Sequence, residues 1–160
     1  YVDDEDVGNL KRKCTFTNYN DVSGDHRTYW LGGALSSETS VRHTASGLAW
    51  KISPTTAYFD ADKPLSFNIA EVFCNSGAAV TATLWVRRSN TGITIKLAAT
   101  AANNAISSDV TDSAAAAADT WEQLSITFTP TKAQPAKIDV LVYGGTTYSA
   151  YIDDFGITQA

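Results

Sequence analysis

Apolar and polar residues alternate along the second half of the chain, in short segments that end at Pro, Gly or Asn-containing stretches. A period of two turns one row of side chains into a core and the other toward water, which is typical of strands in an antiparallel sandwich. The expected inward rows are Leu48, Trp50 and Ile52; Leu65, Phe67 and Ile69; Val80, Ala82, Leu84 and Val86; Ile93, Ile95 and Leu97; Leu124, Ile126 and Phe128; and Ile138, Val140 and Val142.

Turn residues between these rows predict how the strands are joined. Ser89–Gly92 predicts a tight turn that joins the two strands beside it as a hairpin. Gly144 and Gly145 predict a last hairpin, with a closing strand over Ala150–Ile157. Asn75–Gly77 is a further turn signal, and the strand before it would place Ser66, Asn68 and Ala70 outward.

Two stretches lack this alternation. Asp21–Ser40 is rich in Gly, Ser and Asp and predicts a long irregular connection, which favours a contact surface. Ala98–Thr120 contains the alanines 114–118 and predicts a loop with one helical turn. We therefore expect one domain, in which residues 1–44 form an arm and long loop, and residues 45–160 form an all-β, two-sheet antiparallel β-sandwich with jelly-roll topology.

Composition narrows the class of protein. A chain of 160 residues with 44% hydrophobic and 18% charged residues can bury a core as a folded, soluble domain. The formal net charge of −5 argues against nucleic acid as a partner, and no apolar stretch approaches the roughly 20 residues that cross a membrane. The chain has no Met and begins at Tyr1, so we expect a trimmed protein or a piece of a longer one.

The two cysteines, Cys14 and Cys74, permit at most one disulfide. Two reduced, half-buried thiols are the favoured interpretation, because a chain of this size does not need a bridge. A bridge between them would instead place the protein in an oxidising compartment.

Outward residues of the predicted strands supply the candidate ligand-binding surface. If the strands share a sheet, that surface gathers Asn68, Trp85, Arg87, Lys96, Asp139 and Tyr143. Aromatic rings stack on the C–H faces of sugars while polar neighbours bind hydroxyls, so the mixture fits a glycan or a protein surface. In the alternative interpretation, a loop or a neighbouring subunit covers Trp85. Among the other tryptophans, core or edge packing is the favoured interpretation for Trp30 and Trp121, and a core position is favoured for Trp50.

The sequence carries no recognisable catalytic set. His26 and His43 are isolated and lack zinc-ligand spacing. There is no nucleophile elbow, no phosphate-binding loop and no dinucleotide fingerprint. Glu71 and Glu122 have the chemistry of glycosidase carboxylates, but nothing in the sequence places them together. We therefore expect a protein that is not an enzyme.

Several segments resemble two groups of proteins. The order of SGLAWKI, VTATLWVRR, WEQLSITFTP and YIDDFGI is similar to that in the jelly-roll carbohydrate-binding modules attached to glycoside hydrolases. A second resemblance, closer in sequence, is to the surface domains of tailed-phage virion proteins. It rests on the segments AEVFCNSGAAVTATLWVRR, ADTWEQLSITFTPT and YGGTTYSAYIDDFGITQA. The first resemblance implies glycan recognition and the second implies assembly on a particle.

The resemblance to carbohydrate-binding modules also implies a structural calcium site. In those modules a closing-strand Asp joins N-terminal residues around the ion, and Asp153 or Asp154 occupies the matching place. The acidic residues 3–6 are the candidate N-terminal partners. The alternative is a solvated acidic terminus and an Asp that caps a loop.

Two functions follow as hypotheses. The first is a structural virion protein, a capsid decoration or fibre domain on a phage surface, with other virion proteins or identical subunits as partners and cell-surface glycan as a further ligand. The second is an extracellular carbohydrate-binding module of a secreted polysaccharide-acting enzyme. Under either hypothesis we expect neither nucleic acid nor a membrane as a partner.

Overall fold

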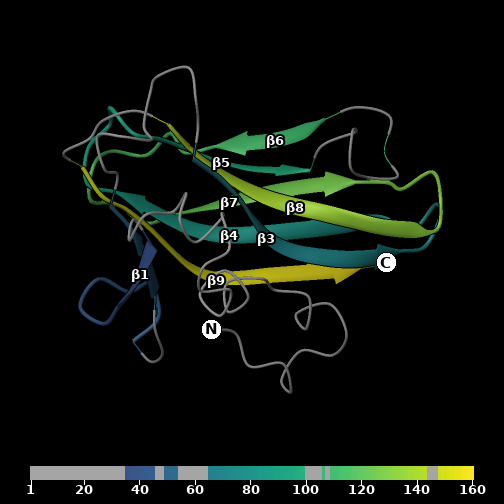
Figure 1. Cartoon of the computed structure of the whole chain (residues 1–160), viewed down its shortest axis with the longest axis horizontal. Helices are drawn as coiled ribbons and strands as arrows, with labels where there is room; N and C mark the ends of the chain where they lie inside the picture. Colours follow the sequence, from purple (N-terminus) through teal and green to yellow (C-terminus); the bar gives the residue numbers. More distant parts are fainter. Residues whose placement is uncertain (1–34, 46–48, 54–64, 100–105, 107–108, 144–147) are drawn as a thin grey trace, which may run out of the picture.

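The computed structural model of the chain describes residues 35–45, 49–53, 65–99, 106, 109–143 and 148–160. Every regular element within these residues is a strand, and Figure 1 shows the strands stacked in two layers. All pairs of neighbouring strands are antiparallel. The predicted all-β, two-sheet antiparallel sandwich with jelly-roll topology is therefore confirmed.

One layer is a five-stranded sheet with the spatial order β1, β2, β9, β4, β7. Its centre is β9, which lies between β2 and β4 although it is far from both in the sequence. Residues distant in sequence therefore become neighbours on its outer side. The strands are β1 (Leu35–Glu38), β2 (Ala49–Ile52), β4 (Val80–Arg88), β7 (Glu122–Phe128) and β9 (Ala150–Gln159).

The other layer is a four-stranded sheet with the spatial order β3, β8, β5, β6. The long strand β8 lies at its centre and pairs with β3 on one side and β5 on the other. The strands are β3 (Leu65–Cys74), β5 (Thr94–Ala99), β6 (Val110–Ser113) and β8 (Gln134–Tyr143).

The hydrophobic core fills the space between the two sheets. Each buried Ile or Leu in it contributes about 1.5–3 kcal/mol relative to an exposed side chain. Trp50 packs against this core, as predicted. Leu48, Leu65 and Phe67 lie outside the described side chains. The other predicted inward rows are buried: Ile52; Ile69; Val80, Ala82, Leu84 and Val86; Ile93, Ile95 and Leu97; Leu124, Ile126 and Phe128; and Ile138, Val140 and Val142.

Both predicted hairpins are wrong. The predicted tight turn after β4 is present, with Gly92 N donating to Asn90 Oδ1 at 2.7 Å, but β4 and β5 belong to different sheets. The same is true of β8 and β9. Alternation shows which side chains face the core, and two strands that face it from opposite sheets satisfy the pattern as well as two paired strands do.

A β-bulge interrupts β3. Asn68 pairs with Asp139 and Ala70 pairs with Ile138, so Ile69 is an extra residue on this strand. Ile69 and Ala70 are both fully buried. The prediction that Ala70 faces outward is therefore wrong, because an extra residue reverses the alternation that follows it.

Two strands lie in stretches that the sequence predicts to be irregular. β1 falls within Asp21–Ser40, and β6 falls within Ala98–Thr120. β6 is four residues long and none of its side chains is fully buried, so it has no apolar row that could reveal it. The alanines 114–118 form a loop rather than a helical turn.

Candidate functional site

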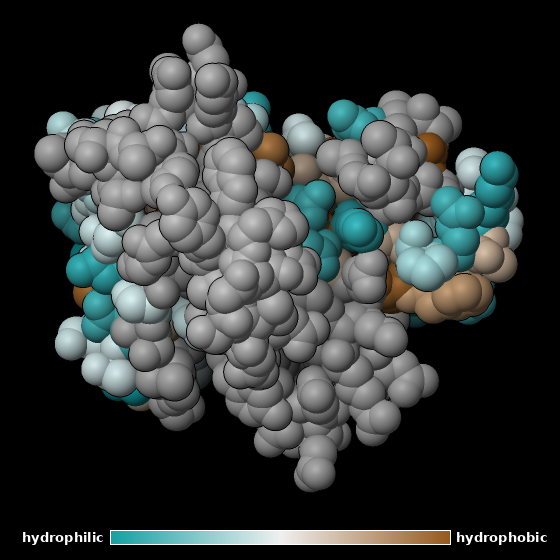
Figure 2. Space-filling model, in the orientation of Figure 1, coloured by the Kyte–Doolittle hydropathy of each residue, from teal (hydrophilic) through white to brown (hydrophobic). Residues whose placement is uncertain are grey.

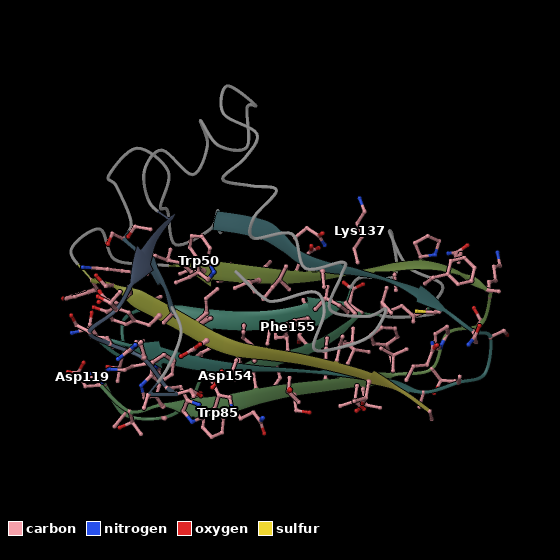
Figure 3. All side chains as sticks on the ribbon, turned by 90° about the horizontal axis from the view of Figure 1, so that it is seen from below. Trp50, Trp85, Asp119, Lys137, Asp154 and Phe155 are labelled. Atoms are coloured by element: carbon pink, nitrogen blue, oxygen red, sulfur yellow. The ribbon has the colours of Figure 1, made fainter. Side chains whose placement is uncertain are left out.

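The six outward residues predicted to form one surface lie on two different sheets. Asn68, Lys96, Asp139 and Tyr143 belong to the four-stranded sheet, and Trp85 and Arg87 belong to the five-stranded sheet. Figure 3 shows Trp85 on one side of the sandwich and Lys137, from the four-stranded sheet, projecting from the other. The premise of one shared sheet is wrong, and two separate surfaces remain.

The first surface, the Tyr143 face, consists of Asn68, Lys96, Asp139 and Tyr143. Tyr143 pairs with Thr94 on β5, so Lys96 is its diagonal neighbour across the sheet. The Lys96 ammonium lies 5.2 Å from the centroid of the Tyr143 ring, within the range of a cation–π contact. Both side chains are half-buried. Such a contact contributes about 0.5–1 kcal/mol at an exposed site, so a ligand can displace the ammonium from the ring.

Asn68 stabilises the bulge of β3, where it pairs with Asp139. Its side-chain amide donates at 3.0 Å to the carbonyls of Ala70 and Ile138. The same nitrogen donates to Oδ1 of Asp139 at 3.1 Å. Burial raises the pKa of Asp139, and the hydrogen bond from Asn68 opposes that shift. Asn68 is therefore a positioning residue, and Asp139 is the hydrogen-bond acceptor on the Tyr143 face.

The second surface, the Trp85 cluster, consists of His43, Trp85, Trp121, Asp153 and Asp154. The His43 and Trp85 rings are stacked, with centroids 3.7 Å apart and planes 14° apart. Trp121 meets the same imidazole edge-on, at 5.7 Å between centroids. A segment of this chain therefore covers Trp85, which agrees with the alternative interpretation of that residue. Trp121 packs at the edge of the sheet, as predicted.

The two closing-strand aspartates attach the same segment to β9. His43 N donates to Asp153 Oδ2 at 2.8 Å, and His43 Nδ1 lies 2.8 Å from Asp154 Oδ2. Thr44 adds hydrogen bonds to both carboxylates, from its backbone N to Asp153 and from its hydroxyl to Asp154. Asp154 has a φ of 46° at a bulge where β9 carries one more residue than β4. Both aspartates therefore act as loop caps, and Figure 3 shows Asp154 on the same side of the sandwich as Trp85.

Calcium binding by Asp153 and Asp154 stays a prediction of the resemblance, and the contacts of the two carboxylates favour the alternative of loop-capping aspartates. Their oxygens accept hydrogen bonds from His43 and Thr44, which is not the arrangement of a ready calcium shell. No group of three or more His, Cys, Asp or Glu side chains in the described ranges is placed to hold a metal ion. The acidic residues 3–6 lie outside those ranges.

Two adjacent arginines on β4 have different surroundings. Arg87 makes an exposed ion pair, with 2.9 Å between its Nη2 and Asp119 Oδ1. Arg88 is 8% exposed, and its guanidinium donates to the carbonyls of Ala116 at 2.7 Å and Ile93 at 2.8 Å. Arg87 thus has a partner in its own chain, and Arg88 connects the loops at one end of the sandwich.

The side chains of Glu122 and Cys74 contact other parts of the fold. The Glu122 carboxylate accepts hydrogen bonds from the backbone N–H groups of Ala115 and Ala116. Cys74 is fully buried and forms no disulfide with a described residue, and burial raises the pKa of its thiol. Cys14, like Trp30 and His26, lies outside the described residues.

The rest of the described surface offers few large apolar side chains. Phe73 is 57% exposed and Tyr148 is 36% exposed, and no other large hydrophobic side chain among those whose burial is described reaches that level. Figure 2 shows mainly hydrophilic and neutral colours on the described surface in its orientation, with small brown areas. No helix in the described part has the length and hydropathy that a bilayer crossing requires.

The pattern-based reasoning missed His43 and Arg88. His43 lies in a loop, and its partner Asp154 is 111 residues away in the sequence. A motif with fixed residue spacing could therefore not reveal this pair. Arg88 did leave a signal. It continues the inward row of β4 after Val86, and an Arg in an inward position predicts a buried, hydrogen-bonded guanidinium.

Scans against protein-family models and against curated protein sequences give no match. Solved structures do match. The carbohydrate-binding module TmCBM61, in complex with beta-1,4-galactotriose, superposes with a TM-score of 0.60 and 18% identity over 79% of this chain and 83% of that one. A CBM4 structure gives 0.52 and 16% identity over 80% and 81% of the two chains.

A phage protein is also similar. The enzymatically active domain of bacteriophage CBA120 tailspike protein 4 gives a TM-score of 0.59 and 14% identity over 79% of this chain. The match corresponds to 18% of the tailspike chain. At these identities the likeness establishes a shared fold: the chain has a jelly-roll sandwich like that of carbohydrate-binding modules.

Proposed function

We propose that this chain is a non-catalytic, extracellular carbohydrate-binding module that recognises a polysaccharide on its Tyr143 face. The observation that carries the proposal is the half-buried Tyr143 ring, with the Lys96 ammonium 5.2 Å from its centroid and Asp139 on the same face. The fold that the chain shares with TmCBM61 and CBM4 supports the same function.

Each residue of the Tyr143 face has a distinct task in this proposal. The Tyr143 ring stacks on the apolar C–H face of a sugar. Lys96 moves off the ring and donates hydrogen bonds to hydroxyl or ring oxygens, and Asp139 accepts hydrogen bonds from hydroxyl groups. Asn68 holds the bulge and the Asp139 carboxylate in place.

A binding role without catalysis is compatible with the surroundings of Glu122, Asp153 and Asp154. Glu122 accepts two backbone hydrogen bonds from the alanine loop, and Asp153 and Asp154 hold His43 and Thr44. Hydrolysis of a glycoside would require a pair of carboxyl groups on either side of the scissile bond. The carboxylates of the Trp85 cluster instead bind the chain itself.

The test is a glycan array followed by affinity electrophoresis. TmCBM61 was solved with beta-1,4-galactotriose, so β-1,4-galactan is the first soluble polymer to include. We expect retardation of the wild-type chain by at least one neutral polysaccharide, and loss of that retardation in Tyr143→Ala. Retardation by no polymer, or equal retardation of the variant, contradicts the proposal.

The tailspike likeness favours a second candidate function. In this alternative the chain is a structural virion protein, a capsid decoration or fibre domain on a phage surface, whose partners are identical subunits or other virion proteins. The matching structure is a phage tailspike, and it superposes on this chain with a TM-score of 0.59. Light scattering separates the two candidates, because a stable trimer or larger assembly supports the virion role and a monomer supports the binding module.

A further inference from the structure

The Trp85 cluster has the side chains of a sugar-binding site, and His43 and Thr44 of the same chain occupy it. The His43 imidazole lies nearly parallel to the Trp85 ring, 3.7 Å from it and tilted by 14°. That is the position in which a pyranose would place its C–H face on an indole. The Trp121 ring stands edge-on to the imidazole at 67° and forms a side wall.

The polar contacts of His43 and Thr44 also correspond to those of a sugar. Asp153 Oδ2 accepts a backbone N–H at 2.8 Å, and Asp154 Oδ2 accepts the imidazole Nδ1–H and the Thr44 hydroxyl. Hydroxyl groups of a sugar are donors of the same kind. An aromatic ring, a side wall and two carboxylates therefore surround one small, polar, ring-bearing segment.

We propose that Trp85, Asp153 and Asp154 form a second saccharide site, which His43 and Thr44 hold closed. This site lies on the five-stranded sheet, opposite the Tyr143 face, and it does not depend on that face. Its ligand class is a neutral pyranoside oligosaccharide, because two adjacent carboxylates accept hydroxyl hydrogens and repel uronates.

The covering segment, His43 and Thr44, lies at the surface and is not part of the hydrophobic core. Thr44 is exposed, and the His43 side chain keeps 28% of its accessible area. Neither residue belongs to a strand. A ligand competes with this segment, so the apparent affinity of the site is lowered by the fraction of molecules in which the segment is detached.

The experiment isolates this site in a Tyr143→Ala background, where the first proposed site is removed. His43→Ala in that background uncovers the Trp85 ring. The probes are xylohexaose, β-1,4-galactotriose and a trigalacturonate, titrated by calorimetry, with tryptophan fluorescence as a second readout. We expect His43→Ala to bind a neutral oligosaccharide at least about tenfold more tightly than its background does, and not to bind the uronate.

Three further variants keep the result interpretable. Trp85→Ala added to His43→Ala should abolish the gained affinity, while Thr81→Ala, on the same strand outside the cluster, should leave it unchanged. If His43→Ala does not fold, His43→Gln keeps a polar partner for Asp154 without a ring and should give the same gain. Unchanged affinity in the folded variant, or a gain that survives Trp85→Ala, overturns the inference. Binding by the wild-type chain that Tyr143→Ala abolishes supports the proposed function independently of this outcome.

Discussion

Asn68 donates a hydrogen bond to Asp139, with 3.1 Å between Nδ2 and Oδ1, and thereby connects the bulge of β3 to the carboxylate of the Tyr143 face. The bond does not offset the cost of taking the carboxylate out of water, since burial raises the pKa of Asp139 above its ordinary value of 3.8. The folded chain consequently retains a proton on Asp139 at pH values where the unfolded chain has already lost it.

The stability of the protein should depend on pH through this group. The free energy of unfolding should fall as the pH rises from 3.8 through the raised pKa of Asp139, because the folded state binds more protons than the unfolded state in that window. Asp139→Asn should therefore be more stable than wild type at pH 7, and the difference should close as the pH approaches 3.8. Urea titrations of both chains between pH 3 and 7 measure it, and a difference that does not change with pH would contradict the assignment.

Arg88 should matter far more to folding than its neighbour. Arg88→Met removes the guanidinium that donates to the buried carbonyl of Ile93 and the half-buried carbonyl of Ala116, and we expect a loss of about 2–4 kcal/mol in the free energy of unfolding. Arg87→Met is the matched control, because it removes an ion pair to the exposed Asp119 and should cost less than about 1 kcal/mol. Equal losses in denaturant titrations would show that Arg88 does not hold the loops.

Gly156 should not tolerate a side chain. A Cβ at this position would lie 2.8 Å from Thr83 Oγ1 on the paired strand, so Gly156→Ala should cost about 1–3 kcal/mol. Thr83→Ala removes the opposing hydroxyl, and the double variant should recover most of the loss relative to Thr83→Ala. Thermal unfolding of the four chains gives the coupling directly. If the effects of Gly156→Ala and Thr83→Ala are additive, the loss of stability does not come from the contact between these two residues.

Chelation tests the calcium prediction. The Asp153 and Asp154 carboxylates already accept hydrogen bonds from His43 and Thr44, so we expect EDTA to leave the unfolding temperature unchanged. Calcium should likewise produce no stabilisation at millimolar concentration. A fall of several degrees on chelation, reversed by calcium and absent in Asp153→Asn, would instead show a structural ion at this place.

The inward rows could be predicted from the sequence because core burial imposes a period of two on each strand. Val80 to Val86 and Leu124 to Phe128 are buried where that period places them. Pairing could not be predicted in the same way. β4 and β5 face the same core from opposite sheets, so the pattern that suggested a hairpin is equally compatible with a crossing between layers.

The candidate site was harder to predict than the core. Tyr143 and Lys96 could be recognised as outward residues, but their separation from Trp85 depends on which sheet each strand joins. Ala70 shows a second limit, since one extra residue at the bulge reverses the facing of the residues that follow. The stack of His43 on Trp85 depends on a loop conformation that hydrophobic periodicity does not encode.

The most direct test of the account is calorimetric titration of the chain with the best oligosaccharide from the glycan array, for wild type, Tyr143→Ala and Tyr148→Ala. Tyr148 is the matched control, because it is an exposed tyrosine outside the strands. We predict that Tyr143→Ala weakens binding by at least about tenfold, or ~1.4 kcal/mol, while Tyr148→Ala binds like wild type. Wild-type affinity in a folded Tyr143→Ala, or no binding of any glycan by the wild-type chain, would contradict recognition at the Tyr143 face.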